Sequence, residues 1–399
     1  MKRVGFLYNH DAAHQVAHIA GIMAALATQH TDFEVSAFVS RPHIETVARA
    51  LVGEAAAARI NWITLSLSPG AQRIARLADK LFPYSRLAAL RQNQDRFRGL
   101  DALVSTERTC LRIKDWLGDA APEFIYVPHG SGDRNVAYHP DLSRFDLSLF
   151  SGQKLVYAAL RAGIVTQNSA RVIGYPKFDG IELAQRPKLF PNENPVFLYN
   201  PHFDPHLSSF YQFGDAILEH FAAHPEWNLI FAPHVMIWKK RLHISLEYRT
   251  AAWRRLIDPR YEALPNILID QGSPRLIDMT YTRAADVYIG DASSQVYEFL
   301  SEPRAAIFID AAETKGWESH ENYQFWHNGP VVTSTAQLFE LLAKWRQIAD
   351  EYRAAQERLF AYTIDRTDEP ASIRGAEAIA TFVSNQAIPA GCQNSPASI

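Results

Sequence analysis

Short apolar runs alternate with longer segments of helical periodicity along most of the chain. In the first half, strand-forming runs span residues 2–8, 33–39, 60–67, 101–104, 124–127 and 145–150. Helix formers recur between them over 14–29, over a long region at 71–99 that is broken near Pro83, and from Lys154 onward. This alternation is typical of a parallel sheet with helices on both faces. The first half therefore predicts a doubly wound α/β domain.

The second half repeats the alternation after a change in composition. We expect strands at 196–199, 228–232, 267–270, 286–289 and 305–310, and helices at 210–223, 274–284, 294–300, 335–362 and 373–385. Residues 185–195 contain three prolines and no periodicity, which indicates a linker. The pattern predicts two Rossmann-like domains, 1–184 and 196–386, facing each other across a cleft, and a disordered tail at 387–399.

Composition narrows the class of protein. The chain has 399 residues, of which 47% are hydrophobic, and its net charge of −3 argues against a nucleic-acid partner. Two cysteines provide no disulfide framework, which fits a reducing cytoplasm. The apolar run at 4–8 is too short for a signal peptide, and the most apolar helical stretch, 16–28, is shorter than a membrane span. We expect a cytoplasmic protein that is at most peripheral at the inner face of the membrane.

Several well-known motifs are missing from the sequence. There is no P-loop, no G-x-S-x-G and no HExxH, and Gly130-Ser131-Gly132 lacks the third glycine of a dinucleotide fingerprint. These absences argue against a P-loop kinase, a common dehydrogenase, an α/β-hydrolase and a zinc protease. Nothing in the sequence requires a cofactor or a metal centre, and a divalent ion bound together with a diphosphate substrate stays open.

Two predicted strands run directly into a Pro-His pair. His129 follows 124–127 and is itself followed by Gly130, which lets a ligand approach the backbone. His234 follows the strand at 228–232, after Pro233. Histidines at the carboxyl ends of strands can accept a proton or hold a phosphate oxygen. The alternative for each is a histidine that only caps the next turn.

A third candidate lies where the strand at 286–289 meets a helix. Asp291, Ser293 and Ser294 precede that helix, and Glu298 lies one turn inside it. The hydroxyls and free N–H groups at such a point can bind an anion, and Glu298 could accept hydrogen bonds from a ribose. One of these residues could instead be an ordinary helix cap.

Three further groups of polar residues are weaker candidates. His202, Asp204 and His206 lie in a proline-broken loop, and we interpret them as cleft lining rather than as metal ligands. His10, His14 and His18 recur every four residues and would share one helix face. The basic segment 73–98 could contact a membrane surface or an anionic substrate, or it could be a solvated helix.

Taken together, these residues resemble the CDP-glycerol glycerophosphotransferases of teichoic-acid synthesis. The resemblance lies in His129-Gly130, the segment 174–179, Pro233-His234, the segment 291–298 and the strand at 303–309, in that order along the chain. Lys177 stands where the family has an arginine, and Glu298 where it has an aspartate.

The resemblance implies a GT-B fold, with an acceptor-side first domain and a second domain that binds the donor nucleotide. The activity it implies is transfer of glycerol phosphate or ribitol phosphate from a CDP-linked donor to a glycan or lipid-linked acceptor. His129 would then be the general base. His234, Ser293 and Ser294 would hold the donor diphosphate, and Asp291 would shape their loop. Gly130, Lys177 and Glu298 belong to the same implied donor site.

Other functions stay open at this stage. A GT-B glycosyltransferase with a nucleotide-sugar donor differs only in the donor, and a sugar-nucleotide epimerase of the same fold needs no acceptor. A non-catalytic binding protein with a decayed site would bind nucleotide weakly or not at all.

Overall fold

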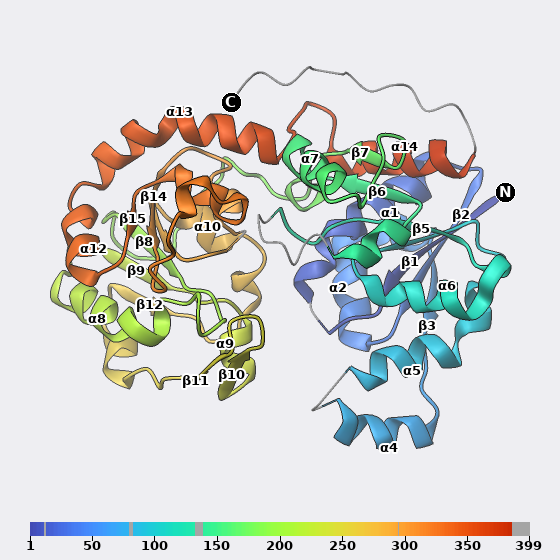
Figure 1. Ribbon diagram of the computed structural model, residues 1–399, viewed down its shortest axis with the longest axis horizontal. Helices are drawn as coiled ribbons and strands as arrows, with labels where there is room; N and C mark the ends of the chain where they lie inside the picture. The colour runs from blue at the N-terminus through green and yellow to red at the C-terminus, as the bar shows by residue number, and fades with distance from the viewer. Residues whose placement is uncertain (12, 80–82, 132–138, 294, 385–399) are drawn as a thin grey trace. The chain divides into compact units, whose positions relative to one another are not determined.

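The computed structural model describes residues 1–11, 13–79, 83–131, 139–293 and 295–384 (Figure 1). Within these ranges the chain divides into two compact units. Unit 1 contains residues 1–129, 139–181 and 364–384, and unit 2 contains residues 130–131 and 182–363. Each unit is built around its own parallel sheet.

Unit 1 holds a seven-stranded sheet in the order β3-β2-β1-β4-β5-β6-β7, with every pair parallel. Its strands are β1 (Lys2–Tyr8), β2 (Phe33–Val39), β3 (Asn61–Thr64), β4 (Ala102–Ser105), β5 (Glu123–Tyr126), β6 (Leu147–Phe150) and β7 (Ala170–Val172). The order reverses between β1 and β4, which is the topological switch point of a Rossmann-type sheet.

Helices cover both faces of the sheet in unit 1. The α-helices are α1 (Ala17–Gln29), α2 (Pro42–Val52), α3 (Glu54–Ala57), α4 (Pro69–Ala78), α5 (Tyr84–Gln92), α6 (Leu111–Leu117), α7 (Gln153–Arg161) and α14 (Ala371–Val383). The 3₁₀ helices are η1 (Ala13–Gln15), η2 (Gln94–Phe97), η3 (Arg108–Cys110), η4 (Gly118–Ala120), η6 (Pro140–Arg144) and η7 (Pro176–Phe178). Val4 and Phe6 pack into one core while Leu7 packs into the other, so both faces of β1 are buried.

The last helix, α14, packs against α1 in unit 1 (Figure 1). The two helices approach closely, because a Cβ atom added at Gly375 would lie 2.9 Å from Cδ1 of Ile22. Ile379 and Val383 of α14 join the same core. The prediction that the helices after residue 196 all close the second domain is therefore wrong for α14, since its apolar stripe is buried in the first.

Unit 2 has a six-stranded parallel sheet in the order β12-β9-β8-β13-β14-β15. Its strands are β8 (Val196–Asn200), β9 (Asn228–Phe231), β12 (Ile267–Ile269), β13 (Val287–Gly290), β14 (Ala305–Ile309) and β15 (Val331–Val332). The chain order 3-2-1-4-5-6 repeats the Rossmann arrangement, with its switch point between β8 and β13. A separate antiparallel hairpin joins β10 (Leu242–Ser245) to β11 (Thr250–Trp253).

The helices of unit 2 vary widely in length. The α-helices are α8 (Phe210–Ala223), α9 (Met236–Lys239), α10 (Thr280–Ala284), α11 (Gln295–Phe299), α12 (Thr335–Leu342) and α13 (Trp345–Thr363). The 3₁₀ helices are η8 (Pro259–Ala263), η9 (Pro274–Leu276), η10 (Trp317–Ser319) and η11 (Glu321–Asn328). Helices α8, α12 and α13 contribute apolar residues to one core with β8, β9, β13 and β14.

The predicted linker at 185–195 is part of unit 2. Arg186 pairs with Asp286 and Glu302 at 3.1 Å each, and Phe190 is buried. The prolines of this segment do end its periodicity, but its side chains are fixed to the sheet edge. The chain passes from unit 1 to unit 2 earlier, after Ile181.

Candidate functional site

In unit 1, the candidate residues gather at the carboxyl edge of the sheet. Asn9 and His10 follow β1, Thr106 follows β4 directly, and His129 comes three residues after β5. Because β1 and β4 flank the switch point, this is the edge at which doubly wound sheets bind ligands.

The hydrogen bonding of His129 fixes its tautomer. Its Nδ1 atom lies 3.0 Å from the carbonyl oxygen of Thr106. A carbonyl oxygen only accepts, so Nδ1 must donate and carry the proton. In neutral His129, the lone pair is therefore on Nε2, as a general base requires.

The surroundings of His129 favour its neutral form. The residue keeps an exposed surface, but its ring lies between the Thr106 carbonyl and the ring of His14, whose centroid is 6.3 Å away. Desolvation by these protein atoms lowers the pKa of His129, the Thr106 carbonyl raises it, and the charge on Arg86 lowers it again, with a net lowering. His129 is therefore predominantly neutral at neutral pH.

Arg86 is held close to His129 by partners in two segments, at Asn9 and at 107–109. Its Nε donates to the carbonyl oxygen of Asn9 at 2.8 Å, and one terminal nitrogen donates to Thr109 at 3.3 Å. It also forms an ion pair with Glu107. Arg86 was grouped with the basic segment 73–98 by sequence, but it faces the sheet edge instead of the solvent.

A group of cation-forming side chains surrounds buried His18. Burial lowers the pKa of His18 strongly, and positive charge on Lys177, His129, His14 and His10 lowers it further. The three histidines at 10, 14 and 18 do not share a helix face as predicted, because α1 begins only at Ala17. The fold nevertheless brings them together, since His10 follows β1 and η1 carries His14 toward the same edge.

The segment 174–179, which carries part of the family resemblance, has mainly an architectural role. The Asp179 carboxylate accepts the backbone N–H groups of Ala371 at 3.1 Å and Ser372 at 2.6 Å, so it caps the first turn of α14. Gly174 has a φ of 87°, and a Cβ there would lie 2.7 Å from the carbonyl oxygen of Asp365. Of this segment, only buried Lys177 stays a candidate for ligand binding.

In unit 2, Asp291 links the two strands that flank the switch point. One carboxylate oxygen accepts the N–H of His202 at 2.8 Å and the N–H of Ser209 at 3.0 Å. His202 follows β8, and Ser209 precedes α8. Asp291 is buried, and its carboxylate holds the loop after β8 through these two N–H groups.

Asp291 is also an unusual acid. Burial raises its pKa to about 7, hydrogen bonds from Ser209 and His202 oppose this shift, and the charge on Asp310 adds to it. Its other carboxylate oxygen, Oδ1, has no hydrogen-bond partner among the described residues. The side chain therefore changes charge near neutral pH.

His234 carries its proton on the opposite nitrogen from His129. Its Nδ1 accepts the N–H of Met236 at 3.3 Å, which places the proton of the neutral ring on Nε2. Burial lowers the pKa of His234 to about 4, and Lys239 contributes to the shift. His234 is therefore a neutral hydrogen-bond donor at neutral pH, not a cation.

His202 lies beside His234 and shares its tautomer. The two rings are 5.6 Å apart, and Nδ1 of His202 accepts the N–H of Asp204 at 3.0 Å. Phe203 packs against both rings, at 4.5 and 4.9 Å. The loop after β8 thus places a second neutral imidazole next to the predicted one.

Of the other four residues predicted to bind the donor, three can be placed in the structure. Ser293 accepts the N–H of Gln295 at 3.3 Å, so it acts as a cap. Glu298 is buried within α11, and Ser294 lies outside the described residues. Gly130 has a φ of 154°, a conformation that favours glycine.

The basic segment 73–98 is only partly a surface patch. Arg73, Ile74, Arg76 and Leu77 are exposed along α4. Within the described part of the chain, no helix combines the length and apolar character needed to cross a membrane. In the same residues, no three or more His, Cys, Asp or Glu side chains are grouped to hold a metal ion.

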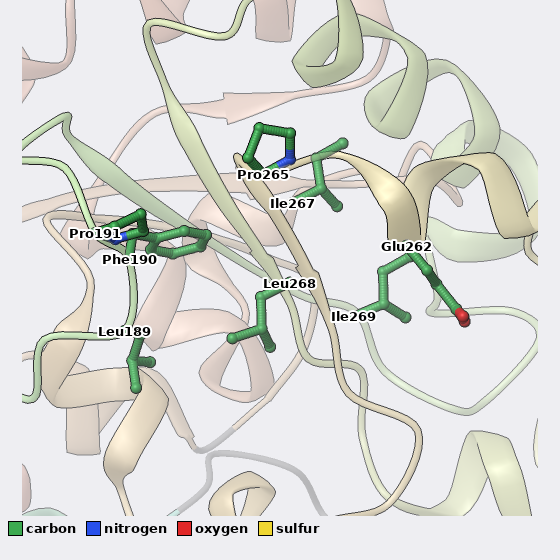
Figure 2. A pocket seen from close by; sticks show the side chains of 8 residues that line it. All are labelled: Leu189, Phe190, Pro191, Glu262, Pro265, Ile267, Leu268 and Ile269. Atoms are coloured by element: carbon green, nitrogen blue, oxygen red, sulfur yellow. The ribbon is translucent and has the colours of Figure 1, made fainter.

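A pocket of about 430 Å³ lies at the β12 edge of unit 2 (Figure 2). Residues 189–191, Glu262, Pro265 and β12 line it. None of the residues that the sequence singled out for chemistry is among them. The pocket is an open hollow between the 185–195 segment and the edge strand, apart from the switch point.

Sequence reasoning missed two contributors to these sites and the pairing of a third. Thr106 acts through its backbone carbonyl, which leaves no signal in residue type. Glu107 matters only because the fold pairs it with Arg86. His202 was noticed in the sequence, but its pairing with His234 depends on β8 and β9 being neighbours in the sheet.

Comparison with known proteins supports the fold. No family model and no curated protein matches the chain. Among solved structures, the chain is similar to the wall teichoic acid polymerase TagF, with 12% identity, a TM-score of 0.61 and coverage of 96% of this chain and 89% of that chain. It is also similar to a putative UDP-N-acetylglucosamine 2-epimerase from Listeria monocytogenes, with 13% identity, a TM-score of 0.60 and coverage of 97% and 98%.

A third similar structure is the UDP-GlcNAc 2-epimerase from Neisseria meningitidis bound to UDP-GlcNAc. The identity is 11%, the TM-score is 0.54, and the alignment covers 96% of this chain and all of that chain. These likenesses confirm the predicted α/β architecture of two Rossmann-like domains in a GT-B fold.

Proposed function

We propose that this protein is a GT-B transferase for glycerol phosphate or a related alditol phosphate. The donor would be CDP-linked, and the acceptor would be a hydroxyl of a cell-surface glycan or of a lipid-linked precursor. The observation that carries the proposal is the Nδ1 contact of His129 with the Thr106 carbonyl, which leaves Nε2 as the free base. The ordered resemblance over residues 125–310 and the fold shared with TagF support the choice of donor.

In the proposed reaction, His129 begins the transfer by accepting a proton. Its Nε2 takes the hydrogen of the acceptor hydroxyl while the acceptor oxygen attacks the phosphorus that carries glycerol. A new P–O bond forms to the acceptor, the bridging P–O bond of the diphosphate breaks, and CMP leaves with the bridging oxygen. Positioning and charge stabilisation supply most of the rate in phosphoryl transfer.

Donor binding is assigned to neutral and cationic side chains. His234 would donate from Nε2 to a diphosphate oxygen, which its tautomer allows. Lys177 would contribute positive charge, and Ser293 and Ser294 would donate hydroxyl hydrogens. Asp291 would act as a positioning residue through the N–H groups of the loop after β8, because its carboxylate is buried.

The other predicted contacts remain part of the proposal. Gly130 would let the donor approach the backbone beside His129, and Glu298 would accept hydrogen bonds from the donor ribose. The enzyme would meet the lipid-linked precursor of such an acceptor at the inner face of the membrane. The exposed apolar and basic side chains of α4 would supply a peripheral contact there.

A nucleotide-sugar enzyme of the same fold is the second candidate. The observation that favours it is the comparable structural likeness to two UDP-GlcNAc 2-epimerases. In that case, His129 and His234 would keep their tautomers, but the donor would be a nucleotide sugar for glycosyl transfer or epimerisation.

A donor screen followed by an acceptor-dependent assay tests the proposal. Thermal shift with CDP-glycerol, CDP-ribitol, CMP and UDP-, GDP- or CMP-sugars should show selective stabilisation by the CDP-alditols. Incubation with that donor and a polyol acceptor should release CMP. His129→Ala should slow release by roughly 10²–10⁴-fold without weakening donor binding.

His43→Ala provides the matched control, because His43 is an exposed histidine on α2. This variant should turn over like the wild type. Stabilisation and turnover with a UDP-sugar alone would replace the proposal with the second candidate. No binding of any nucleotide would favour a non-catalytic protein.

A further inference from the structure

The β10–β11 hairpin presents an apolar face to solvent. Leu242 pairs with Trp253, and Ile244 pairs with Ala251, so all four side chains point to the same outward side. Ile244 is 60% exposed and Trp253 is 69% exposed. Leu246, just after β10, adds an apolar side chain that is 88% exposed. We call the surface formed by these five side chains the hairpin face.

The opposite side of β10 is anchored to unit 2. His243 is buried, its Nδ1 lies 2.6 Å from the Tyr211 hydroxyl, and its Nε2 lies 3.2 Å from the Met236 carbonyl oxygen. Arg254 donates to the carbonyl oxygen of Trp238 at 2.8 Å. The hairpin lies next to α9 (Figure 1), and these bonds hold it in place with its apolar side outward.

Positive charge surrounds the hairpin face. Six cationic side chains and one carboxylate, Glu247, occur between residues 239 and 256. The exposed cations are Lys239, Lys240, Arg241, Arg249 and Arg255. Of these, Arg255 pairs with Asp215 at 2.5 Å. An exposed apolar face with a cationic rim is a feature that soluble surfaces rarely carry without a partner.

We propose that the hairpin face docks this protein onto an anionic lipid surface. Trp253 would sit at the level of the headgroups, where tryptophan is enriched, while Ile244 and Leu246 would enter the acyl boundary. The rim cations would attract lipid phosphates. A second copy of the same face is disfavoured because both copies carry the same strong positive charge.

This inference is independent of the proposed transferase chemistry. It uses none of the residues assigned to proton transfer or donor binding. It also differs from the contact proposed for α4, which belongs to unit 1, whereas the hairpin belongs to unit 2. The experiment must therefore separate the two surfaces.

Vesicle flotation of the full-length protein makes that separation. Phosphatidylglycerol-containing vesicles should bind the wild type, phosphatidylcholine vesicles should bind it much less, and added salt should weaken binding. Ile244→Ser combined with Leu246→Ser should remove most of the flotation, leaving only what α4 supplies. Lys239→Gln, Lys240→Gln and Arg241→Gln together should weaken it by roughly a hundredfold, as expected for loss of three interfacial charges.

Two matched variants test whether the location is correct. Leu51 is an apolar residue on α2, away from the hairpin, and its side chain is 52% exposed. The Leu51→Ser variant should float like the wild type. Ile74→Ser with Leu77→Ser tests α4, and should leave substantial hairpin-dependent binding. Flotation lost only in the α4 variant would overturn the proposal, as would hairpin variants that bind like the wild type.

The fluorescence of Trp253 gives a second readout. Anionic vesicles should shift the tryptophan emission of the wild type to the blue. Trp253→Phe should remove that shift while flotation persists, because phenylalanine keeps the face apolar. A shift that persists unchanged in Trp253→Phe, or a concentration-dependent dimer that the Ile244→Ser, Leu246→Ser variant loses in sedimentation, would overturn the lipid assignment.

Discussion

The Nδ1 atom of His129 lies 3.0 Å from the carbonyl oxygen of Thr106, so the neutral ring carries its proton on Nδ1. His234 has the reverse arrangement, since its Nδ1 accepts the N–H of Met236. Two Pro-His pairs that look alike in the sequence are thus given opposite tautomers by their neighbours. His129 can accept a proton at Nε2, and His234 can donate a hydrogen bond from Nε2.

The pH profile should report the lowered pKa of His129. Catalysis needs the neutral ring, so kcat/KM should rise with pH, with a midpoint below the ordinary value of about 6.5, and level off at neutral pH. Arg86→Gln should move this midpoint upward because it removes a positive charge near the ring. Arg86→Lys, which keeps the charge, should leave the midpoint where it is in the wild type.

Comparison of the two Arg86 variants separates the effect of the lost charge from the effect of lost packing. Both lose the Nε contact with the Asn9 carbonyl, so a loss of packing would change both alike. Unchanged midpoints in both variants would contradict the electrostatic role of Arg86. A midpoint above the ordinary histidine value in the wild type would contradict the assignment of His129.

Substitutions of His234 should distinguish a donor from a cation. His234→Gln places an amide N–H group near the position of Nε2, so it should keep most of the affinity for the donor nucleotide. His234→Ala should raise the donor Kd by roughly five- to tenfold, the value of one neutral hydrogen bond. Calorimetric titration between pH 6 and 8 should show little change in Asp291→Asn, in which the acid that titrates near pH 7 is absent, because the pKa of about 4 keeps the His234 ring neutral throughout.

Equal affinity in His234→Ala and the wild type would remove His234 from the donor site. A Kd of Asp291→Asn that weakens steeply above pH 6 would indicate a cationic histidine, in conflict with the half-buried, Met236-bonded ring of His234.

Asp291 should make folding stability depend on pH. Its pKa is about 7 in the folded protein and about 4 when unfolded, so the folded state holds the proton more tightly. Its contribution to stability is therefore greatest below pH 4 and is lost as the pH rises to 7. Relative to the wild type, Asp291→Asn should gain stability across this range by up to about 4 kcal/mol.

Urea unfolding of both proteins from pH 4 to 8 measures the difference. The buried amide of Asp291→Asn changes the free energy of unfolding by an amount that does not vary with pH. The test is therefore how the difference in free energy between the two proteins changes with pH. Asp270→Asn is the control with opposite sign. Burial raises the pKa of Asp270, but hydrogen bonds from Ser273 and Tyr281 lower it more, so its charged form is stabilised. Parallel stability curves for Asp291→Asn and the wild type would show that Asp291 is charged throughout.

Removal of the Asp179 carboxylate should loosen α14. Asp179→Ala leaves the N–H groups of Ala371 and Ser372 without their acceptor, at a cost of about 1–2 kcal/mol in the free energy of unfolding. Asp368→Ala changes an exposed carboxylate close to α14 and should be nearly neutral. Hydrogen exchange of α14 amides should accelerate only in Asp179→Ala, and equal exchange in both variants would contradict the capping role.

The sequence by itself determined the architecture. Alternating apolar runs and helical segments predicted both doubly wound sheets, because buried parallel strands must be apolar on both faces. The same alternation located the strand ends, and with them His129, His234 and Asp291. Helix 210–223 was predicted at the bounds that α8 has in the structure. The β10–β11 hairpin and the helix α2 were not predicted, although Ile44 and Ala48 of α2 are spaced for one buried helix face.

Only the tertiary structure decided how these residues are partnered. The apolar stripe of α14 does not show in the sequence which domain it packs against. Its burial against α1, and the cap from Asp179 nearly two hundred positions earlier, assign the helix to unit 1. The tautomers of His129 and His234 depend on backbone groups of Thr106 and Met236, and backbone groups leave no mark in residue type. The sequence could specify which groups stand at each strand end, but protonation, burial and hydrogen bonding arise from contacts that exist only after the chain has folded.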